Sequence, residues 1–227
     1  KRFAAEAFVH RFPITKRRLY EAILASLDAF HAESSVDARL RRTLHQVELL
    51  YQRTLYADAG RMLRSVRQLA RQNDRQTILL DVLAWERRLA ERSNYGGVSR
   101  TDVDTLTAEA SALHEELRQV EELWALKSRS FLLLYRTGHA RDAQQATELA
   151  RLNEHPLLAE GATLLTARGR FLHHHVRSAI AFAQGDLSAC SDQLALNHML
   201  LLAEQERFRD EPNLLFSVLS NRIYVLS

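Results

Sequence analysis

Apolar residues recur at alternating steps of four and three along most of this chain, which is the spacing of one face of an α-helix. The pattern is most regular from Leu106 to Leu134, where Lys127 alone interrupts it. It predicts one helix of about 35 residues there. A second regular stretch follows Pro156 and runs from Leu158 to Ala183. Because many apolar residues lie outside both seams, we expect these helices to be buried on several sides rather than to form a coiled coil.

Shorter helices are predicted before the long ones, each bounded by polar turn residues. They are Phe3 to Phe12, ending before Pro13; a helix capped by Thr15 that runs to Phe30; a helix capped by Ser34 and Asp37 that runs to Tyr51; and helices from about Asp58 to Arg71 and about Gln76 to Arg92.

The clearest break in the pattern is Ser93 to Ser99, which holds two adjacent glycines. We therefore expect residues 1–95 and 102–227 to be two helical-repeat segments of one continuous solenoid, with a turn at 96–101 that bends at Gly96 and Gly97. The apolar pattern that ends at Leu226 has no capping residue after it, so we also expect the chain to be a fragment of a longer protein.

The composition favours helices and excludes a disordered tail. The 227 residues are 46% hydrophobic and 26% charged, which is ordinary for a globular chain. They include 39 Leu and 30 Ala against 16 Val and Ile together, with 7 Gly and 3 Pro. Leu and Ala favour helices, whereas β-branched residues favour strands. The expected fold class is all-α.

Small residues also recur at corresponding places, which indicates stacked helix pairs. Gly138 is followed by Ala143, and Gly185 by Cys190, so that a glycine ends one helix and a small residue five positions later opens the next. Ala57, Gly97, Gly138 and Gly185 are separated by 40, 41 and 47 residues. This is an uneven period of the kind that helical-repeat proteins show.

With Ala150 and Pro156, these residues make the chain resemble the tetratricopeptide-repeat family and its looser helical-repeat relatives. The resemblance implies a right-handed α-solenoid of stacked antiparallel helix pairs, and a scaffold for protein interactions without chemistry of its own. The chain departs from the family in its period, which exceeds about 34 residues. It also has Asn197 where a second small residue is expected, and Pro156 stands one position late.

Catalytic and cofactor motifs are missing from the sequence. It holds no glycine-rich phosphate loop, no Gly-x-Ser-x-Gly elbow and no His-Glu-x-x-His. His173, His174 and His175 are consecutive, so a helix would turn them in different directions and they could not converge on one metal ion. Cys190 is the one cysteine and is expected in the core. We expect no cofactor, no metal and no enzymatic activity.

A row of arginines is the first candidate binding surface: Arg61, Arg64, Arg67, Arg71 and Arg75. The row suits an acidic protein partner, or it is a solvated face. Nucleic acid is disfavoured because no aromatic residues interleave with the arginines. Residues 1–100 carry a net charge of +8 and residues 101–227 a net charge of −5, which leaves head-to-tail self-association open.

The second candidate surface is a stripe at helical spacing, formed by Arg168, Phe171, His175, Ser178 and Phe182. In a solenoid one helix of each pair lines the concave groove, where such a mixed stripe would suit an extended peptide. The alternative is that Phe171 and Phe182 pack against the neighbouring repeat, with Arg168 and His175 at the rim.

These observations predict a protein-interaction scaffold that binds a peptide or protein partner. A sensory or regulatory ligand-binding domain of a larger regulator is the alternative, and an enzyme is the third class. No apolar run approaches the roughly 20 residues of a membrane-spanning helix. The lone cysteine and the absence of a secretory signal pattern favour the cytoplasm.

Overall fold

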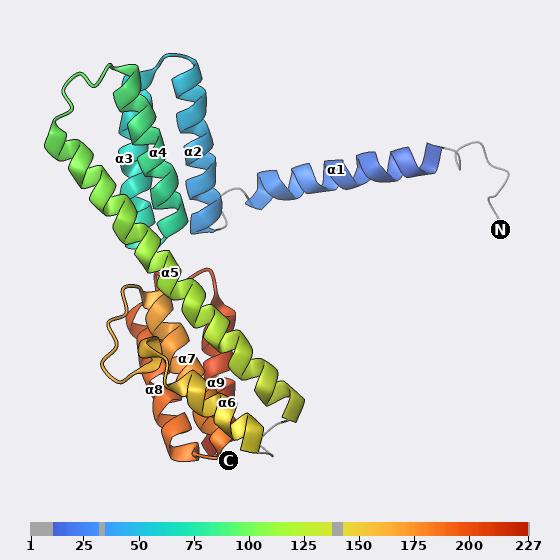
Figure 1. Ribbon diagram of the computed structural model, residues 1–227. Helices are drawn as coiled ribbons and strands as arrows, with labels where there is room; N and C mark the ends of the chain where they lie inside the picture. The colour runs from blue at the N-terminus through green and yellow to red at the C-terminus, as the bar shows by residue number, and fades with distance from the viewer. Residues whose placement is uncertain (1–10, 32–34, 138–142, 227) are drawn as a thin grey trace. The chain divides into compact units, whose positions relative to one another are not determined.

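The computed structural model describes residues 11–31, 35–137 and 143–226, without the side chains of 31, 135–137 and 143. These residues form nine α-helices and one 3₁₀ turn and contain no strand, which confirms the all-α class (Figure 1). The helices are α1 (Phe12–His31), α2 (Val36–Gln52), α3 (Tyr56–Gln72), α4 (Gln76–Arg92), α5 (Arg100–Thr137), α6 (Ala143–Asn153), α7 (Ala167–Gln184), α8 (Leu187–Ala203) and α9 (Pro212–Leu226), and the turn is η2 (Pro156–Leu158).

The chain divides into two compact units, Lys1–Val66 and Arg67–Ser227, and the division falls within α3. The turn predicted to join two segments at 96–101 lies inside the second unit. There the turn that follows α4 ends and α5 begins at Arg100.

In the first unit, α2 and the start of α3 are consecutive helices joined by three residues. Ser35 caps α2, because its Oγ accepts a hydrogen bond from the Ala38 N–H at 3.1 Å. The predicted cap was Ser34, which lies outside the described residues. Tyr51 and Tyr56 meet edge to face across the turn, with ring centroids 5.2 Å apart. The buried residues of this unit are Leu40, Leu44, Val47, Ala59, Leu63 and Val66.

Helix α1 differs from the prediction at its start. Pro13 lies in the first turn of α1 and does not end a helix, because the first turn needs no N–H from its residues. Thr15 is therefore inside α1 and is not its cap. Of the predicted helix from Phe3 to Phe12, the structure describes Arg11 and Phe12, and Phe12 begins α1.

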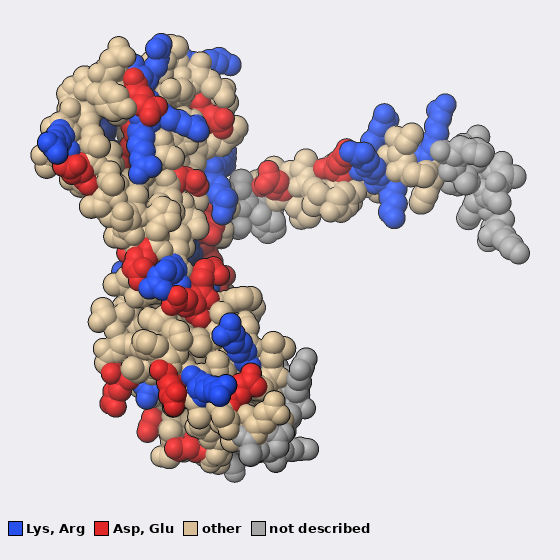
Figure 2. Space-filling model, viewed as in Figure 1, with Lys and Arg blue, Asp and Glu red and all other residues tan. Residues whose placement is uncertain are grey.

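Residues 12–30 of α1 are all exposed, including apolar residues such as Leu19 (61%) and Phe30 (83%). Figure 2 shows basic side chains on the N-terminal part of α1 and acidic ones nearer its C-terminal end. No described residue of the first unit covers the apolar side chains of this helix.

In the second unit, α5 begins with a reciprocal cap. The Ser99 N–H donates to Asp102 Oδ2 at 2.8 Å, and the Asp102 N–H donates to Ser99 Oγ at 3.1 Å. The Ser99 N–H and the Ser99 hydroxyl both donate to the Asp102 carboxylate, and these two hydrogen bonds hold the pKa of Asp102 below its usual value. The helix then continues for 38 residues, in agreement with the single long helix that the sequence predicts.

The predicted helix from Leu158 to Ala183 is wrong in its first part. Pro156–Leu158 forms a single 3₁₀ turn, Gly161 adopts a left-handed conformation with φ of 79°, and α7 begins only at Ala167. Thr166 caps α7 by accepting a hydrogen bond from the Gly169 N–H at 2.9 Å. Leu158 is nevertheless buried, since the turn packs it into the core of the unit.

Helix α7 is central to the second unit and packs against α5 and α8. Its end agrees with the prediction, because Gly185 adopts φ of 80° and Asp186 caps α8 by accepting from the Ala189 N–H at 2.9 Å. Cys190 is buried at the contact between the two helices. Gly138, the corresponding glycine of the other predicted repeat, lies outside the described residues.

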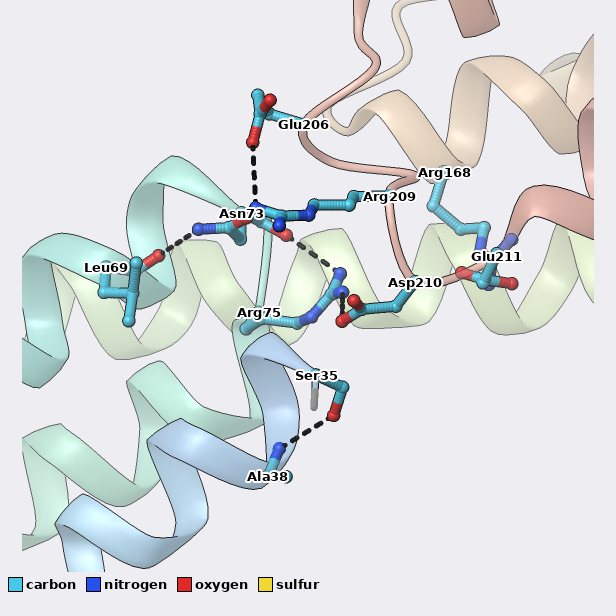
Figure 3. Close-up of polar contacts among 10 residues, drawn as sticks. All are labelled: Ser35, Ala38, Leu69, Asn73, Arg75, Arg168, Glu206, Arg209, Asp210 and Glu211. Atoms are coloured by element: carbon cyan, nitrogen blue, oxygen red, sulfur yellow. Dashed lines mark hydrogen bonds and ion pairs between the residues drawn. The ribbon is translucent and has the colours of Figure 1, made fainter. Parts of the chain in front are cut away.

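Charged side chains join the turn between α3 and α4 to the connection between α8 and α9. Arg75 pairs with Asp210 at 3.5 Å and also donates to the Asn73 carbonyl at 2.9 Å (Figure 3). In the same region, Arg168 of α7 pairs with Glu211 immediately before α9. These pairs help to fix the position of α9, which forms one wall of the site described next.

Candidate functional site

The alternate helices α5, α7 and α9 run in the same direction. Leu123 Cδ1 lies 3.7 Å from the position that a Cβ would take at Gly169. Eight residues further along α5, Phe131 stacks on His175 with ring centroids 5.1 Å apart. Residue numbers therefore rise in the same direction on α5 and α7, so the two helices are parallel.

The same holds for α7 and α9. Arg168 contacts Glu211 just before α9 begins, and Phe182 lies 6.0 Å from Tyr224 near the end of α9, measured between ring centroids. The three helices thus present equivalent positions side by side. Because the three helices are parallel, the earlier residues of each lie at one end of their common surface and the later residues lie at the other end.

A pocket of about 570 Å³ opens on this surface, and we call it the α5–α7–α9 pocket. Helix α8 contributes two residues to it. The lining residues are Lys127, Ser128, Phe131 and Leu134 from α5; His175, Ser178, Ala179 and Phe182 from α7; Cys190 and Leu194 from α8; and Ser217, Asn221, Tyr224 and Val225 from α9.

The two ends of the pocket differ in polarity because of the common helix direction. Lys127, His175 and Ser217 are the first lining residues along α5, α7 and α9, so they lie together at one end of the pocket. Leu134 and Phe182 lie at the opposite end, where Tyr224 packs on Phe182. The pocket therefore has a polar end that carries a cation and an aromatic and aliphatic end.

His175 is held between two phenylalanine rings. Phe131 stacks on it at 5.1 Å and Phe171 at 5.4 Å, so that 8% of the residue stays exposed. Its Nδ1 is buried and has no hydrogen-bond partner. Burial, with a smaller contribution from the nearby Lys127 charge, lowers the pKa of His175 to about 4. The imidazole is therefore neutral at pH 7 and offers one donor and one acceptor.

Lys127 brings the only formal charge among the lining residues that the structure describes. Its ammonium lies 6.0 Å from the centroid of the Phe131 ring, within the range of a cation–π contact. No carboxylate in the described part of the chain pairs with it. The pocket thus holds a half-buried cation whose one described partner is an aromatic ring.

Cys190 also lines the pocket, and burial followed by the charge of Asp186 raises the pKa of its thiol. The thiol is therefore protonated at neutral pH and is a weak nucleophile.

The structure divides the predicted stripe on α7. His175, Ser178 and Phe182 line the pocket. Phe171 instead packs in the core, 2% exposed, between His175 and the ring of Phe208 at 5.9 Å. Arg168 lies outside the pocket, and one of its nitrogens contacts both Glu211 carboxylate oxygens at 2.6 Å. Part of the stripe therefore lines the pocket and part makes structural contacts, a combination that neither interpretation of the sequence predicts.

Ion pairs within the chain occupy most of the predicted arginine row. In the first unit Arg61 pairs with Asp58, and Arg64 is exposed. In the second unit Glu109 forms salt bridges with both Arg67 and Arg71. Arg67 also forms one with Glu86, and Arg75 forms one with Asp210. Arg61, Arg67, Arg71 and Arg75 therefore each have a carboxylate partner within their own unit.

One pocket residue that was not predicted, Lys127, has a weak signal in the sequence. Lys127 is the one polar residue at a seam position of the long helix, and such a position usually faces the protein. Ser217, Asn221 and Tyr224 had no such signal, since their role depends on where α9 lies.

The neighbouring histidines serve structural contacts. His173 Nδ1 lies 2.7 Å from the Leu157 carbonyl oxygen, and His174 Nδ1 lies 2.9 Å from Gln193 Oε1. No set of three His, Cys, Asp or Glu side chains within the described ranges is arranged to hold a metal ion. Among the helices that the structure describes, none has both the length and the apolar character needed to cross a bilayer.

Comparison of the chain with protein-family models, curated proteins and solved structures found no match.

Proposed function

We propose that this chain is a non-enzymatic interaction module that binds a peptide or protein partner in the α5–α7–α9 pocket. One observation carries the proposal: three alternate helices running in the same direction converge on one open pocket, which has an apolar end and a cation at the other. Peptide-binding surfaces of helical repeats are built in this way, from one helix of each pair.

A tetratricopeptide-like right-handed solenoid is part of this proposal. It is supported by the common direction of α5, α7 and α9 and by the turn at Gly185, Asp186 and Cys190, which follows the glycine and small-residue pattern of the sequence. Because the lone cysteine is a buried thiol, a reducing compartment such as the cytoplasm suits the protein.

The side chains of the pocket favour binding over catalysis. The lining contains no carboxylate, the imidazole of His175 is wedged between two rings, and the Cys190 thiol is protonated. A general base or nucleophile needs a pKa near the working pH and a partner within hydrogen-bond reach. Neither the histidine nor the cysteine meets that requirement.

Selection from a pool of synthetic twelve-residue peptides tests the proposal. Retained peptides would be identified by mass spectrometry, and their dissociation constants measured by fluorescence anisotropy. Phe182→Ala should weaken binding by about tenfold, because an anchoring apolar side chain loses its contact surface. The matched control is Leu132→Ala, since Leu132 lies on α5, is 59% exposed and does not line the pocket. Equal binding by both variants, or no retained peptide, contradicts the proposal.

A regulatory domain that binds a small molecule is the second candidate. The unpaired, buried Nδ1 of His175 favours it, together with a pocket volume inside the range of roughly 300–1,000 Å³ that small-molecule sites occupy. Screening a small-molecule library by thermal shift, with His175→Phe as the comparison, tests this candidate. A stabilising compound that acts equally on both proteins would argue against it.

A further inference from the structure

We propose that the bound segment carries an acidic side chain and a bulky apolar side chain three positions apart. The carboxylate would pair with Lys127, and the apolar side chain would fill the end formed by Leu134, Phe182 and Tyr224. This inference rests on the proposed function and specifies the partner of the same pocket.

The unpaired charge of Lys127 supplies the first half of the argument. Several half-buried arginines of the second unit pair with carboxylates: Arg75 with Asp210, Arg168 with Glu211 and Arg170 with Glu204. Lys127 instead lies over an aromatic ring in a pocket that no described carboxylate lines. A half-buried ammonium is stabilised most by an anion that enters the same low-dielectric surroundings. The ligand group at this end should therefore be negative.

The apolar end defines the second group of the ligand. Phe182 and Tyr224 meet there at 6.0 Å between ring centroids, and Tyr224 is 69% exposed although it lines the pocket. Leu134 of α5 closes the same end. A bulky aliphatic or aromatic side chain placed against these residues would remove apolar surface from water on both partners.

The distance between the ends sets the spacing of the two groups. Lys127 and Leu134 are seven residues apart on α5, which is about 10 Å along a helix axis. A polyproline II segment rises about 3.1 Å per residue and returns to the same side every third residue. Residues i and i+3 of such a segment face the pocket together, about 9 Å apart. An acidic-x-x-apolar sequence, read in either direction, matches that length.

Two further polar side chains of the pocket suit the backbone of an extended segment. Polyproline II conformation leaves every main-chain N–H and C=O without an internal partner. His175 at the polar end, whose buried Nδ1 has no hydrogen-bond partner, and Asn221, four residues after Ser217 on α9, both line the pocket. They offer donors and acceptors to these main-chain groups.

Fluorescein-labelled twelve-residue peptides of matched sequence test the inference on the whole 227-residue chain. One set holds Glu-x-x-Phe and Phe-x-x-Glu, a second set holds Gln in place of Glu, and a third holds Lys. The wild type should bind the Glu set about tenfold more tightly than the Gln set. Lys127→Gln should abolish that difference. Lys127→Glu should reverse it, so that the Lys peptides bind best.

Lys16→Glu is the matched control, because Lys16 is exposed on α1 and does not line the pocket. It should leave the preference for Glu unchanged. The reversed preference of Lys127→Glu also shows that this variant is folded, since a misfolded protein would lose binding to all three sets.

Two other results separate this inference from the proposed function. If the Glu and Gln sets bind alike while Phe182→Ala weakens both, the acidic group is wrong and the peptide pocket stands. If no set binds more tightly than scrambled peptides, both proposals are wrong. Preference for Glu that persists in Lys127→Gln also overturns the inference, because the charge must then be recognised elsewhere.

Discussion

The carboxylate of Asp74 accepts a hydrogen bond from the backbone N–H of Ala167, with 3.1 Å between Oδ2 and the nitrogen. The same oxygen accepts from Arg207 Nη1 at 2.9 Å. One side chain in the turn between α3 and α4 therefore contacts the first residue of α7 and the connection that leads to α9. The carboxylate also lies at the N-terminus of α7, where the helix dipole favours negative charge.

Removing this carboxylate should lower the free energy of unfolding by about 1–3 kcal/mol, because the hydrogen bond from the first N–H of α7 and the charged hydrogen bond from Arg207 are lost together. Asp74→Gly is the informative variant, since Asp74 has φ of 52° and glycine keeps that conformation without strain. Urea denaturation measures the change. The control Asp81→Ala, at an exposed position of α4, should change the free energy by less than about 0.5 kcal/mol. Equal effects of the two substitutions would refute the bridging role of Asp74.

His175 predicts a dependence of stability on pH. Its pKa is about 4 in the folded chain against the ordinary 6.5. Between these values the unfolded chain takes up a proton that the folded chain does not, so stability falls as the pH falls from about 6.5 to about 4. The full contribution is about 3 kcal/mol. Above pH 6.5 the imidazole is neutral in both states and contributes no slope.

Comparison with His175→Phe isolates this residue, because burial also lowers the pKa values of His173 and His174 and both act in the same direction. Phenylalanine keeps an aromatic ring between Phe131 and Phe171 but does not titrate. Urea denaturation at pH 7.5 and 4.5 should show a loss of stability about 2 kcal/mol smaller in the variant than in the wild type. A loss of the same size in both proteins would mean that His175 stays solvated.

Helix positions could largely be predicted from local spacing. The helices at α4 and α5 follow from apolar residues at steps of three and four, and the end of α7 follows from Gly185. The prediction from spacing failed between Leu158 and Leu165, where apolar residues keep the helical period but the chain is not α-helical. Leu158 is buried by a 3₁₀ turn and Leu165 is 45% exposed, so the same pattern arose from two unrelated environments.

The candidate site was predictable only on α7. His175 and Phe182 share one face of a helix, which spacing reveals, whereas Lys127 and Tyr224 join them only through packing over long sequence separations. The ion pairs could not be predicted from the sequence either. Arg67 is 42 residues from Glu109 and Arg168 is 43 residues from Glu211, so a row of arginines in the sequence could not be distinguished from a paired structural network.

Asn197 predicts a substitution that stabilises the protein. It is fully buried on α8, and both its Oδ1 and Nδ2 lack a hydrogen-bond partner. Burying an unsatisfied amide costs about 1–3 kcal/mol, and leucine has a similar volume without polar atoms. Asn197→Leu should therefore raise the free energy of unfolding by about 1–2 kcal/mol, measured by urea denaturation. Asn213→Leu, at an exposed position of α9, is the control and should have little effect. A less stable Asn197→Leu protein would indicate a polar partner for this amide.

Arg168 tests whether the structural part of the predicted stripe is separate from the pocket. It pairs with Glu211 at 2.6 Å, each side chain being 36% exposed, and lies two helical turns before His175. A double-mutant cycle with Arg168→Ala and Glu211→Ala should give a coupling free energy of about 0.5–1 kcal/mol, because the pair is partly screened by solvent. Peptides that depend on Phe182 should bind Arg168→Ala as tightly as the wild type. Weaker peptide binding by Arg168→Ala would show that Arg168 contributes to the partner-binding surface.

Arg64 and Arg67 are three residues apart in α3 and should respond oppositely to charge reversal. Arg67 is 20% exposed at its side chain and pairs with both Glu86 and Glu109, whereas Arg64 is exposed. Arg67→Glu would place three carboxylates together with only Arg71 to balance them, so it should lower the free energy of unfolding by about 3 kcal/mol or more. Arg64→Glu should change it by less than about 0.5 kcal/mol. Thermal denaturation at low and high salt distinguishes the two, because added salt should partly restore Arg67→Glu by screening the repulsion. Similar melting temperatures for the two variants would show that the row is a solvated face after all.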